Sequence, residues 1–508
     1  MSPSVPPETA PAAGRPGRPS PPRAKLARTL TTPKVAFIAV AAAAPLATAV
    51  GTLPLSFALG AGPAVPALLL LAGLTLLCFC CGYAAISREV GQGGGFYGCV
   101  ARGLGRPAAV GAGMVAVVAY TAVVVALLDA FGYAAQGVAA AHGLHLAWQV
   151  WGALGLAAVG VLGCRHAGAS ARVLAVCLAG QAAALLALDV AVLAAHGTAA
   201  LPAASFAPQR VLAPGAGVSV MFAFASFVGF ESAALYGAEA RDPGRSVPRA
   251  TLLAVLLVAA CSVLTSWVAV GALGADRVRP TAAAHLGDLF FGLGAHYLGG
   301  PAATAMQLLL CASLFASWLA LHHAAARYLL LLGRDRLLPG RLDAVHPRHR
   351  APHRAGAVQT ALTAAVAAAC AAAGPDPYPG MSALLGLGIL GVIALQAAAS
   401  VAVLGYYRRR PGHWWHTRLA PALGAAGLLA ATVLVLRDFP ALTGSSDPAV
   451  TALPWLLAVA AAGGAAYACR LRAARPDRYA LLAGLRAGEG RPGLPAQRDP
   501  RAARRTAT

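Results

Sequence analysis

Charged residues are scarce in this chain. Only 11% of its 508 residues are charged and 58% are hydrophobic, whereas soluble domains carry about 25% charged residues. The alternation of polar and apolar residues that marks the strands of a membrane barrel is also absent. The shortage of charge excludes a soluble domain, and the missing alternation argues against a β-barrel. The sequence therefore predicts an all-α integral membrane protein.

Groupings suited to covalent or metal chemistry are missing as well. Ten cysteines are scattered through the apolar stretches, and Cys78, Cys80 and Cys81 cluster in one of them. No histidine or carboxylate pattern completes a metal site there, so a packing role is favoured. Neither a zinc-binding His/Glu spacing nor a nucleophile motif is found. The sequence thus disfavours a membrane-embedded enzyme, and neither a metal nor a cofactor is expected.

Long apolar runs, in contrast, are abundant. A membrane-spanning helix needs about 20 mostly apolar residues. Twelve segments fit this description: 35–59, 64–86, 109–141, 148–164, 169–195, 215–237, 250–274, 300–332, 357–373, 381–406, 418–436 and 452–470. They predict one transmembrane domain over 34–475, flanked by basic tails at 1–33 and 476–508. Both tails are expected to be disordered, apart from a short helix near Tyr479–Leu485.

The net charge of +22 is distributed unevenly. With a cytoplasmic N-terminus, 34 of the 39 lysines and arginines fall on the cytoplasmic side and four fall outside. Cytoplasmic loops of membrane proteins carry this excess of positive charge. The pattern predicts twelve crossings with both termini inside, and basic loops that touch anionic lipid rather than nucleic acid. Heavy use of Ala, Gly and Arg is typical of a protein encoded by a GC-rich bacterial genome. The expected location of such a helical membrane protein is the bacterial inner membrane.

One carboxylate lies in the middle of an apolar run. Glu231 falls within Gly217–Gly237, two residues after Gly229. A carboxyl in hydrocarbon costs roughly 2.5–3.5 kcal/mol on insertion scales and is a functional hypothesis by default. The first apolar run is also interrupted, because Pro45 removes a backbone donor. The two interrupted runs are five crossings apart, as in inverted-repeat transporters; the alternative is that Pro and Gly are simply common in membrane helices.

The residues around Glu231 follow a recognisable pattern. It reads F-x-x-F-x-G-F-E, then an acidic residue, then N/D-P-x-R-x-x-P-R. The matching residues are Phe224, Phe227, Gly229, Phe230, Glu231, Glu239, Asp242, Pro243, Arg245, Pro248 and Arg249. Together with Gly93–Gly98 and Ala325–Pro339, this resembles the amino acid–polyamine–organocation (APC) superfamily. The resemblance implies a LeuT-like fold, with helices 1–5 and 6–10 as inverted repeats and two additional helices.

The resemblance also implies a substrate site between broken helices 1 and 6. A half-helix N-terminus carries positive partial charge and suits a carboxylate. The substrate carboxylate is expected near Thr48, Val50, Gly51 and Thr52, and the amine near carbonyls around Phe227, Gly229 and Phe230. Phe224 is a further candidate substrate-binding residue. The helix 1 motif has one glycine where the family often has more. Ala225 stands where some members have an aromatic cap, so either Phe222, Phe224 or Phe227 caps the substrate or the pocket is larger.

Glu231 has three interpretations: gating through protonation, direct contact with substrate, or a structural hydrogen bond. Asp129 is a second candidate coupling or substrate carboxylate, whereas Asp189 is expected to be interfacial. Glu239, Arg241, Asp242, Arg245 and Arg249 are expected to form an ion-pair network that closes the cytoplasmic gate. Arg327 is expected to snorkel or to pair near the inner surface. Gln181 and Gln396 are expected to bridge helices, and His322 and His323 to pack.

The coupling ion is the least determined feature. The chain has two lysines, Lys25 and Lys34, so the helix 5 lysine of some proton-coupled relatives has no counterpart. A proton acting through Glu231 or Asp129, sodium bound near Ser313 and Ser317, and substrate exchange remain alternatives, with proton coupling or exchange favoured over sodium. We predict a secondary transporter of an amino acid or derived amine; the alternative is a non-transporting sensor or scaffold with the same fold.

Overall fold

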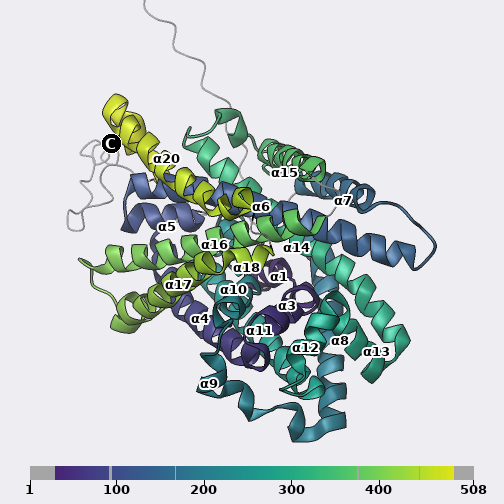
Figure 1. Cartoon of the computed structure of the whole chain (residues 1–508). Coiled ribbons are helices and arrows are strands. Elements are labelled where there is room, and N and C mark those ends of the chain that lie inside the picture. The colour runs from purple at the N-terminus through teal and green to yellow at the C-terminus, as the bar shows by residue number, and fades with distance from the viewer. Residues whose placement is uncertain (1–28, 91–93, 166, 374–376, 445–446, 485–508) are drawn as a thin grey trace, which may run out of the picture.

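The computed structural model describes residues 29–90, 94–165, 167–373, 377–444 and 447–484 (Figure 1). Over these ranges the chain is helical, apart from turns and one isolated β-bridge between Leu30 and Ala240. The all-α class is therefore confirmed. Most of the two predicted tails lies outside the described residues. The short helix expected near Tyr479–Leu485 is present as α21 (Pro476–Ala480), followed by the 3-10 turn η9 (Leu482–Gly484).

Within the described residues, helices at eleven of the twelve predicted spans are long and apolar enough to cross a membrane. They are Thr32–Leu59, Gly62–Ser87, Arg106–Ala140, Ala175–Ala200, Ala216–Gly237, Pro243–Leu273, Gly300–Arg334, His353–Ala372, Gly380–Tyr407, Trp415–Arg437 and Pro448–Ala474. The remaining prediction, 148–164, corresponds to α7 (Trp148–Gly163), an apolar helix of 16 residues. That length is below the roughly 20 residues of a typical span.

The first span is broken in its middle. Helix α1 (Thr32–Ala43) ends at Ala44, whose φ of 46° is left-handed, and Pro45 starts the short α2 (Pro45–Ala47). A π-helical turn, η1 (Thr48–Thr52), then leads into α3 (Leu53–Leu59). Proline cannot donate the helical hydrogen bond, and π-helical turns are frequent at functional sites. The interruption predicted from Pro45 is confirmed.

The sixth span is broken at Gly229. Helix α10 (Ala216–Ala225) gives way to a turn, and a 3-10 segment, η5, follows over Phe230–Ala238. Gly229 has a φ of 117°, which side chains other than glycine rarely adopt. A Cβ at Gly229 would lie 2.6 Å from the Cβ of Ala42 at the end of α1. The two interrupted spans therefore touch at their breaks.

Long helices surround this pair of broken spans. Helix α6 (Arg106–Ala140) packs against α14 (Gly300–Arg334), α16 (Pro377–Tyr407) and α20 (Leu453–Ala474). On the other side, α4 (Val65–Val90) packs against α11 (Pro243–Leu273) and α17 (Ala420–Arg437). In Figure 1, α1, α3 and α10 lie at the centre of the view, whereas α7 and α15 lie together at one edge.

The remaining helices are shorter or peripheral. They are α5 (Gly95–Gly103), α8 (Ala167–His196), α9 (Pro208–Val211), α12 (Val278–Ala284), α13 (Leu289–Leu298), α15 (His353–Ala373), α18 (Phe439–Thr443) and α19 (Pro448–Thr451). The segment 275–299 forms two short helices, α12 and α13. Helix α12 packs on α3, where Arg279 donates to the carbonyl of Gly60, and α13 contacts η1.

Candidate functional site

The carboxyl group of Glu231 lies at the break of the sixth span. The residue is 2% exposed. Its Oε1 accepts a hydrogen bond from the hydroxyl of Tyr120 on α6 at 2.7 Å. The backbone N–H of Gly229 lies 3.1 Å from Oε1 and 3.0 Å from Oε2. The carboxyl group thus joins an amide freed at the break to a neighbouring span.

Aromatic rings surround this carboxyl group. The rings of Tyr120 and Tyr328 lie 5.3 Å apart, and the Tyr328 hydroxyl accepts from the backbone N–H of Phe96 on α5 at 3.4 Å. The ring of Phe230 meets Phe79 of α4 edge-on at 6.1 Å. Such low-dielectric surroundings strengthen each hydrogen bond and make an unpaired charge costly. Loss of a hydrogen-bond partner of Glu231 therefore costs a large free energy.

The break of the first span offers backbone groups to one side. Gly51 is exposed, Thr52 is half-buried, and a Cβ at Gly51 would meet nothing within 4 Å. Thr48 and Val50, by contrast, are buried. The Thr48 hydroxyl donates to the carbonyl of Ala43 at 3.1 Å. Of the four residues predicted to bind a carboxylate, only Gly51 and Thr52 face open space.

The predicted aromatic residues of the sixth span are buried. Phe224 is 5% exposed, and Phe227 and Phe230 are fully buried. A Cβ at Gly73 of α4 would lie 3.5 Å from the ring of Phe227, and Phe230 packs on Phe79 of the same helix. Ala225 alone among its neighbours is half-buried. The rings of Phe227 and Phe230 thus serve packing.

The structure keeps Asp129 apart from this site. It follows Tyr120 by nine residues on α6, which places it about 13 Å farther along the helix and on the opposite face. Its neighbour there is Cys370 of α15. Asp189, expected to be interfacial, is instead buried and accepts from Thr265 of α11 at 2.9 Å. Neither carboxylate contacts the breaks.

Glu239 pairs differently from the sequence expectation. Its Oε1 accepts from Arg327 Nε at 2.9 Å and from Nη2 at 2.5 Å. Both side chains are 4% exposed, and the Arg327 guanidinium lies 4.1 Å from the ring centroid of Tyr236. Arg327 therefore pairs deep in the protein instead of snorkelling. The pair joins the end of η5 to α14.

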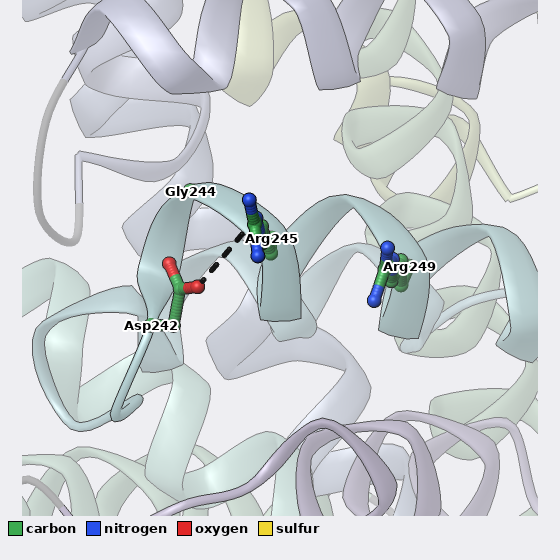
Figure 2. A pocket seen from close by; sticks show the side chains of 4 residues that line it. All are labelled: Asp242, Gly244, Arg245 and Arg249. Carbon is green, nitrogen blue, oxygen red and sulfur yellow. Dashed lines mark ion pairs between the residues drawn. The ribbon is translucent and has the colours of Figure 1, made fainter.

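The expected arginine network is thus only partly formed. Asp242 and Arg245 form an exposed pair at 4.0 Å, and Arg249 is exposed one turn later. With Gly244 these three residues line an open pocket of about 490 Å³ (Figure 2). The exclusion of Glu239 from this network corrects the prediction: a buried carboxylate needs a partner at its own depth, and Arg327 provides one.

The polar residues of the eighth span are also engaged. The Ser317 hydroxyl donates to the carbonyl of Ala42 at 2.5 Å, where α1 ends. The Ser313 hydroxyl donates to the side-chain oxygen of Gln181 at 2.7 Å, so the helix-bridging role predicted for Gln181 is confirmed. The ring nitrogens of His322 have no partner among the described residues.

Sequence reasoning missed Tyr120, Tyr236 and Tyr328. Each is fully or almost fully buried and holds one of the charged groups or a backbone amide. Tyrosine in the middle of an apolar run usually has a partner for its hydroxyl, and this signal was available. The identity of the partner could not be predicted, because Tyr120 and Glu231 lie 111 positions apart.

Two interrupted spans that touch at their breaks, with a buried carboxyl on the second, are typical of secondary transporters. The amino acid permease family matches residues 30–463, and the chain belongs to that family. It is therefore a multi-pass membrane protein of the APC superfamily, a family of transporters and not of enzymes that implies a LeuT-like fold.

Individual relatives are similar over a shorter stretch. An uncharacterized transporter of Mycobacterium bovis and uncharacterized transporters of two Mycobacterium tuberculosis strains are each 33% identical over 204 residues. The match covers 40% of this chain and 42% of each relative. The chain thus aligns with about two fifths of the length of these curated relatives.

Proposed function

We propose that the chain carries an amino acid or a derived amine across the bacterial inner membrane by alternating access, with a proton as the coupling ion. The observation that carries the proposal is the buried carboxyl of Glu231, held by Tyr120 and by the amide of Gly229. The carboxyl connects the broken sixth span to α6, so its protonation state bears directly on how these elements fit together.

A zwitterion suits the broken spans. Gly51 is exposed, with open space beside it, and Thr52 is half-buried; the N-terminus of a half-helix favours a carboxylate. The carbonyl ends of the opposite half-helix favour an ammonium. Glu231 is the one acidic side chain that we place at the breaks, which argues against a polyamine, because several positive charges would need several anions.

Protonation of Glu231 gives a mechanism for coupling. As a carboxylate, Glu231 accepts hydrogen bonds from both Tyr120 and Gly229. The neutral acid carries one donor of its own and a weaker acceptor, so the link between η5 and α6 weakens. Sodium bound near Ser313 and Ser317 stays an alternative, because hydroxyls that donate to protein oxygens keep their lone pairs for a cation. Substrate exchange without net proton movement is another coupling mode to test.

The side of the chain termini is closed in this conformation. Glu239 and Arg327 are paired and buried. Leu30 donates its N–H to the carbonyl of Glu239 at 3.0 Å and accepts from the N–H of Arg241 at 2.9 Å. Gly51, on the first break, remains exposed. We therefore assign this conformation to the outward-facing half of the transport cycle.

Uptake into proteoliposomes tests the proposal. A panel of radiolabelled amino acids and amines would be offered with and without an inward proton gradient. One pH unit supplies about 1.4 kcal/mol, or about tenfold accumulation per coupled proton. We expect the gradient to drive uptake in the native protein and to have no effect in Glu231→Gln. Asp129→Asn is the matched control, because it removes a buried carboxylate remote from the breaks, and it should keep the gradient response.

Three results would redirect the proposal. Loss of the gradient response in Asp129→Asn but not in Glu231→Gln would move the coupling site to Asp129. Uptake only into vesicles preloaded with substrate would indicate an exchanger. Saturable binding without uptake, in folded and correctly inserted protein, would favour a sensor that retains the permease fold.

A further inference from the structure

The segment after the last span folds back onto the transporter. Residues 476–484 form α21 and η9, and they lie against α5, the start of α6 and the end of α14. Leu482 is 1% exposed and belongs to the main hydrophobic core. Its neighbour Leu481 is 66% exposed. One side chain of the pair thus anchors the segment, whereas the other faces outward.

Polar contacts fix the segment at both of its ends. Asp335, just after α14, accepts from the backbone N–H of Ala483 at 2.6 Å and also from the hydroxyl of Tyr97 on α5. Arg106, at the start of α6, donates to the carbonyl of Ala480 at 2.9 Å, and its guanidinium lies 5.2 Å from the ring centroid of Tyr479. Asp335 therefore joins three separate parts of the chain.

Helix α5 in turn packs against the broken sixth span at the candidate site. A Cβ at Gly95 would lie 2.6 Å from Leu235 of η5 and 3.1 Å from the hydroxyl of Tyr328. Tyr328 is the ring that packs on Tyr120, the partner of Glu231. Contacts therefore run without interruption from Ala483 through α5 to the break of the sixth span.

From this chain of contacts we propose that residues 476–484 are a latch: they hold α5 against η5, and they must detach before the pathway opens on the side of the termini. The latch acts on α5 through Asp335 and Tyr97, and its attachment to the membrane domain depends on burial of Leu482. Detachment leaves α5 without one of its supports, so that α5 can separate from η5. The latch makes the C-terminal segment a control point for release of the substrate.

A native cysteine reports on α5. Cys99 lies on that helix, is 1% exposed, and directs its sulfur toward the carbonyl of Ala399 at 3.7 Å. Burial raises the pKa of the Cys99 thiol, which further slows its reaction with a maleimide while α5 is closed. Cys261 on α11 is a partly buried thiol elsewhere in the same protein, so its reaction rate detects general unfolding.

The test measures maleimide labelling of Cys99 by peptide mass spectrometry, with the full chain in nanodiscs. In Leu482→Glu and in a chain ending at Arg475, we expect labelling about tenfold faster, because the reaction follows the local opening equilibrium. Leu481→Glu introduces the same charge one residue away and should label at the native rate. Cys261 should react at an unchanged rate in all of these proteins.

The labelling experiment needs no substrate, so its result does not depend on whether the proposed transport activity is correct. Native labelling rates at Cys99 in Leu482→Glu and in the truncated chain would overturn the proposal. If Leu482→Glu fails to fold, Leu482→Ala is the milder variant. Equal acceleration at Cys99 and Cys261 in every variant would also overturn it, because the segment would then be a general structural anchor.

Discussion

At the scale of single residues, the candidate site is sensitive to mutation because the buried carboxyl of Glu231 has few hydrogen-bond partners. Glu231 receives hydrogen bonds from Tyr120 and from the Gly229 amide, and aromatic rings fill the space around it. Water cannot replace a lost partner in such surroundings without a rearrangement. Small changes at Tyr120 and Gly229 are therefore expected to have large effects.

Replacement of Tyr120 by Phe removes the hydroxyl that donates to Glu231 and keeps the ring. Hydrogen bonds to charged groups contribute about 1.5–3 kcal/mol, so we expect Tyr120→Phe to lower the thermal stability and to weaken the proton-gradient response. Tyr467→Phe, on an exposed ring of α20, is the control and should change neither. Thermal unfolding and uptake would be measured in parallel. A native gradient response in Tyr120→Phe would exclude this bond from coupling.

Replacement of Gly229 by Ala tests the break itself. The φ of 117° strains any side chain, and the new Cβ would come within 2.6–3.0 Å of Ala42 atoms. Strained backbone costs about 1–3 kcal/mol, and the clash adds to it. We expect Gly229→Ala to abolish uptake and to lower the unfolding temperature. Gly463→Ala, where a Cβ meets nothing within 4 Å, should be neutral. An active and stable Gly229→Ala protein would mean that the breaks do not touch.

At the scale of elements, the pair of Glu239 and Arg327 holds η5 to α14. Removal of one partner from a buried ion pair costs about 3–5 kcal/mol, since the other charge is left without compensation. Arg327→Met should therefore destabilise the protein strongly, and Arg327→Met with Glu239→Leu should recover part of the loss. Thermal unfolding of the two single variants and the double variant measures this recovery.

The exposed pair of Asp242 and Arg245 supplies the control for this cycle. Surface ion pairs contribute about 0–1 kcal/mol, so Asp242→Asn should leave the unfolding temperature nearly unchanged. If the double variant were no more stable than the worse single variant, the buried pair would not explain the loss. The stabilising contact would then be the stacking of Arg327 on Tyr236.

How far the sequence predicts the structure differs from element to element. The two breaks were predictable because Pro45 and Gly229 act locally on their own helices. Glu231 was predictable because a carboxyl in an apolar run is costly. The pairing of Glu239 with Arg327 was not, since the two residues are 88 positions apart. The distance of Asp129 from the breaks could not be predicted either, because composition does not indicate which face of α6 meets the breaks.

At the scale of the whole molecule, three contacts close the same side. They are the bridge from Leu30 to Ala240, the pair of Glu239 and Arg327, and the docking of Ala483 on Asp335. Asp335 follows Arg327 by eight residues at the end of α14. Residues near both described ends of the chain thus lie toward the same end of α14.

This shared side determines how α7 is interpreted. Eleven spans would place the two ends on opposite sides of the membrane, whereas twelve place them together. We therefore predict that helix α7, although only 16 residues long, crosses as well. Thinning of the bilayer around a short hydrophobic helix costs only fractions of a kcal/mol per Å, so a crossing by α7 is physically reasonable.

Reporter fusions test this topology. We expect a cytoplasmic reporter to be active after Arg165 and at both ends of the chain, and a periplasmic reporter to be active after His145. The physical reason is the excess of Lys and Arg on one set of loops, 34 against four, which orients the spans during insertion. A fusion after Gly274 is the control for the outer side. The same signal after His145 and after Arg165 would show that α7 does not cross, and it would separate the two ends that the contacts at Leu30 and Ala483 bring together.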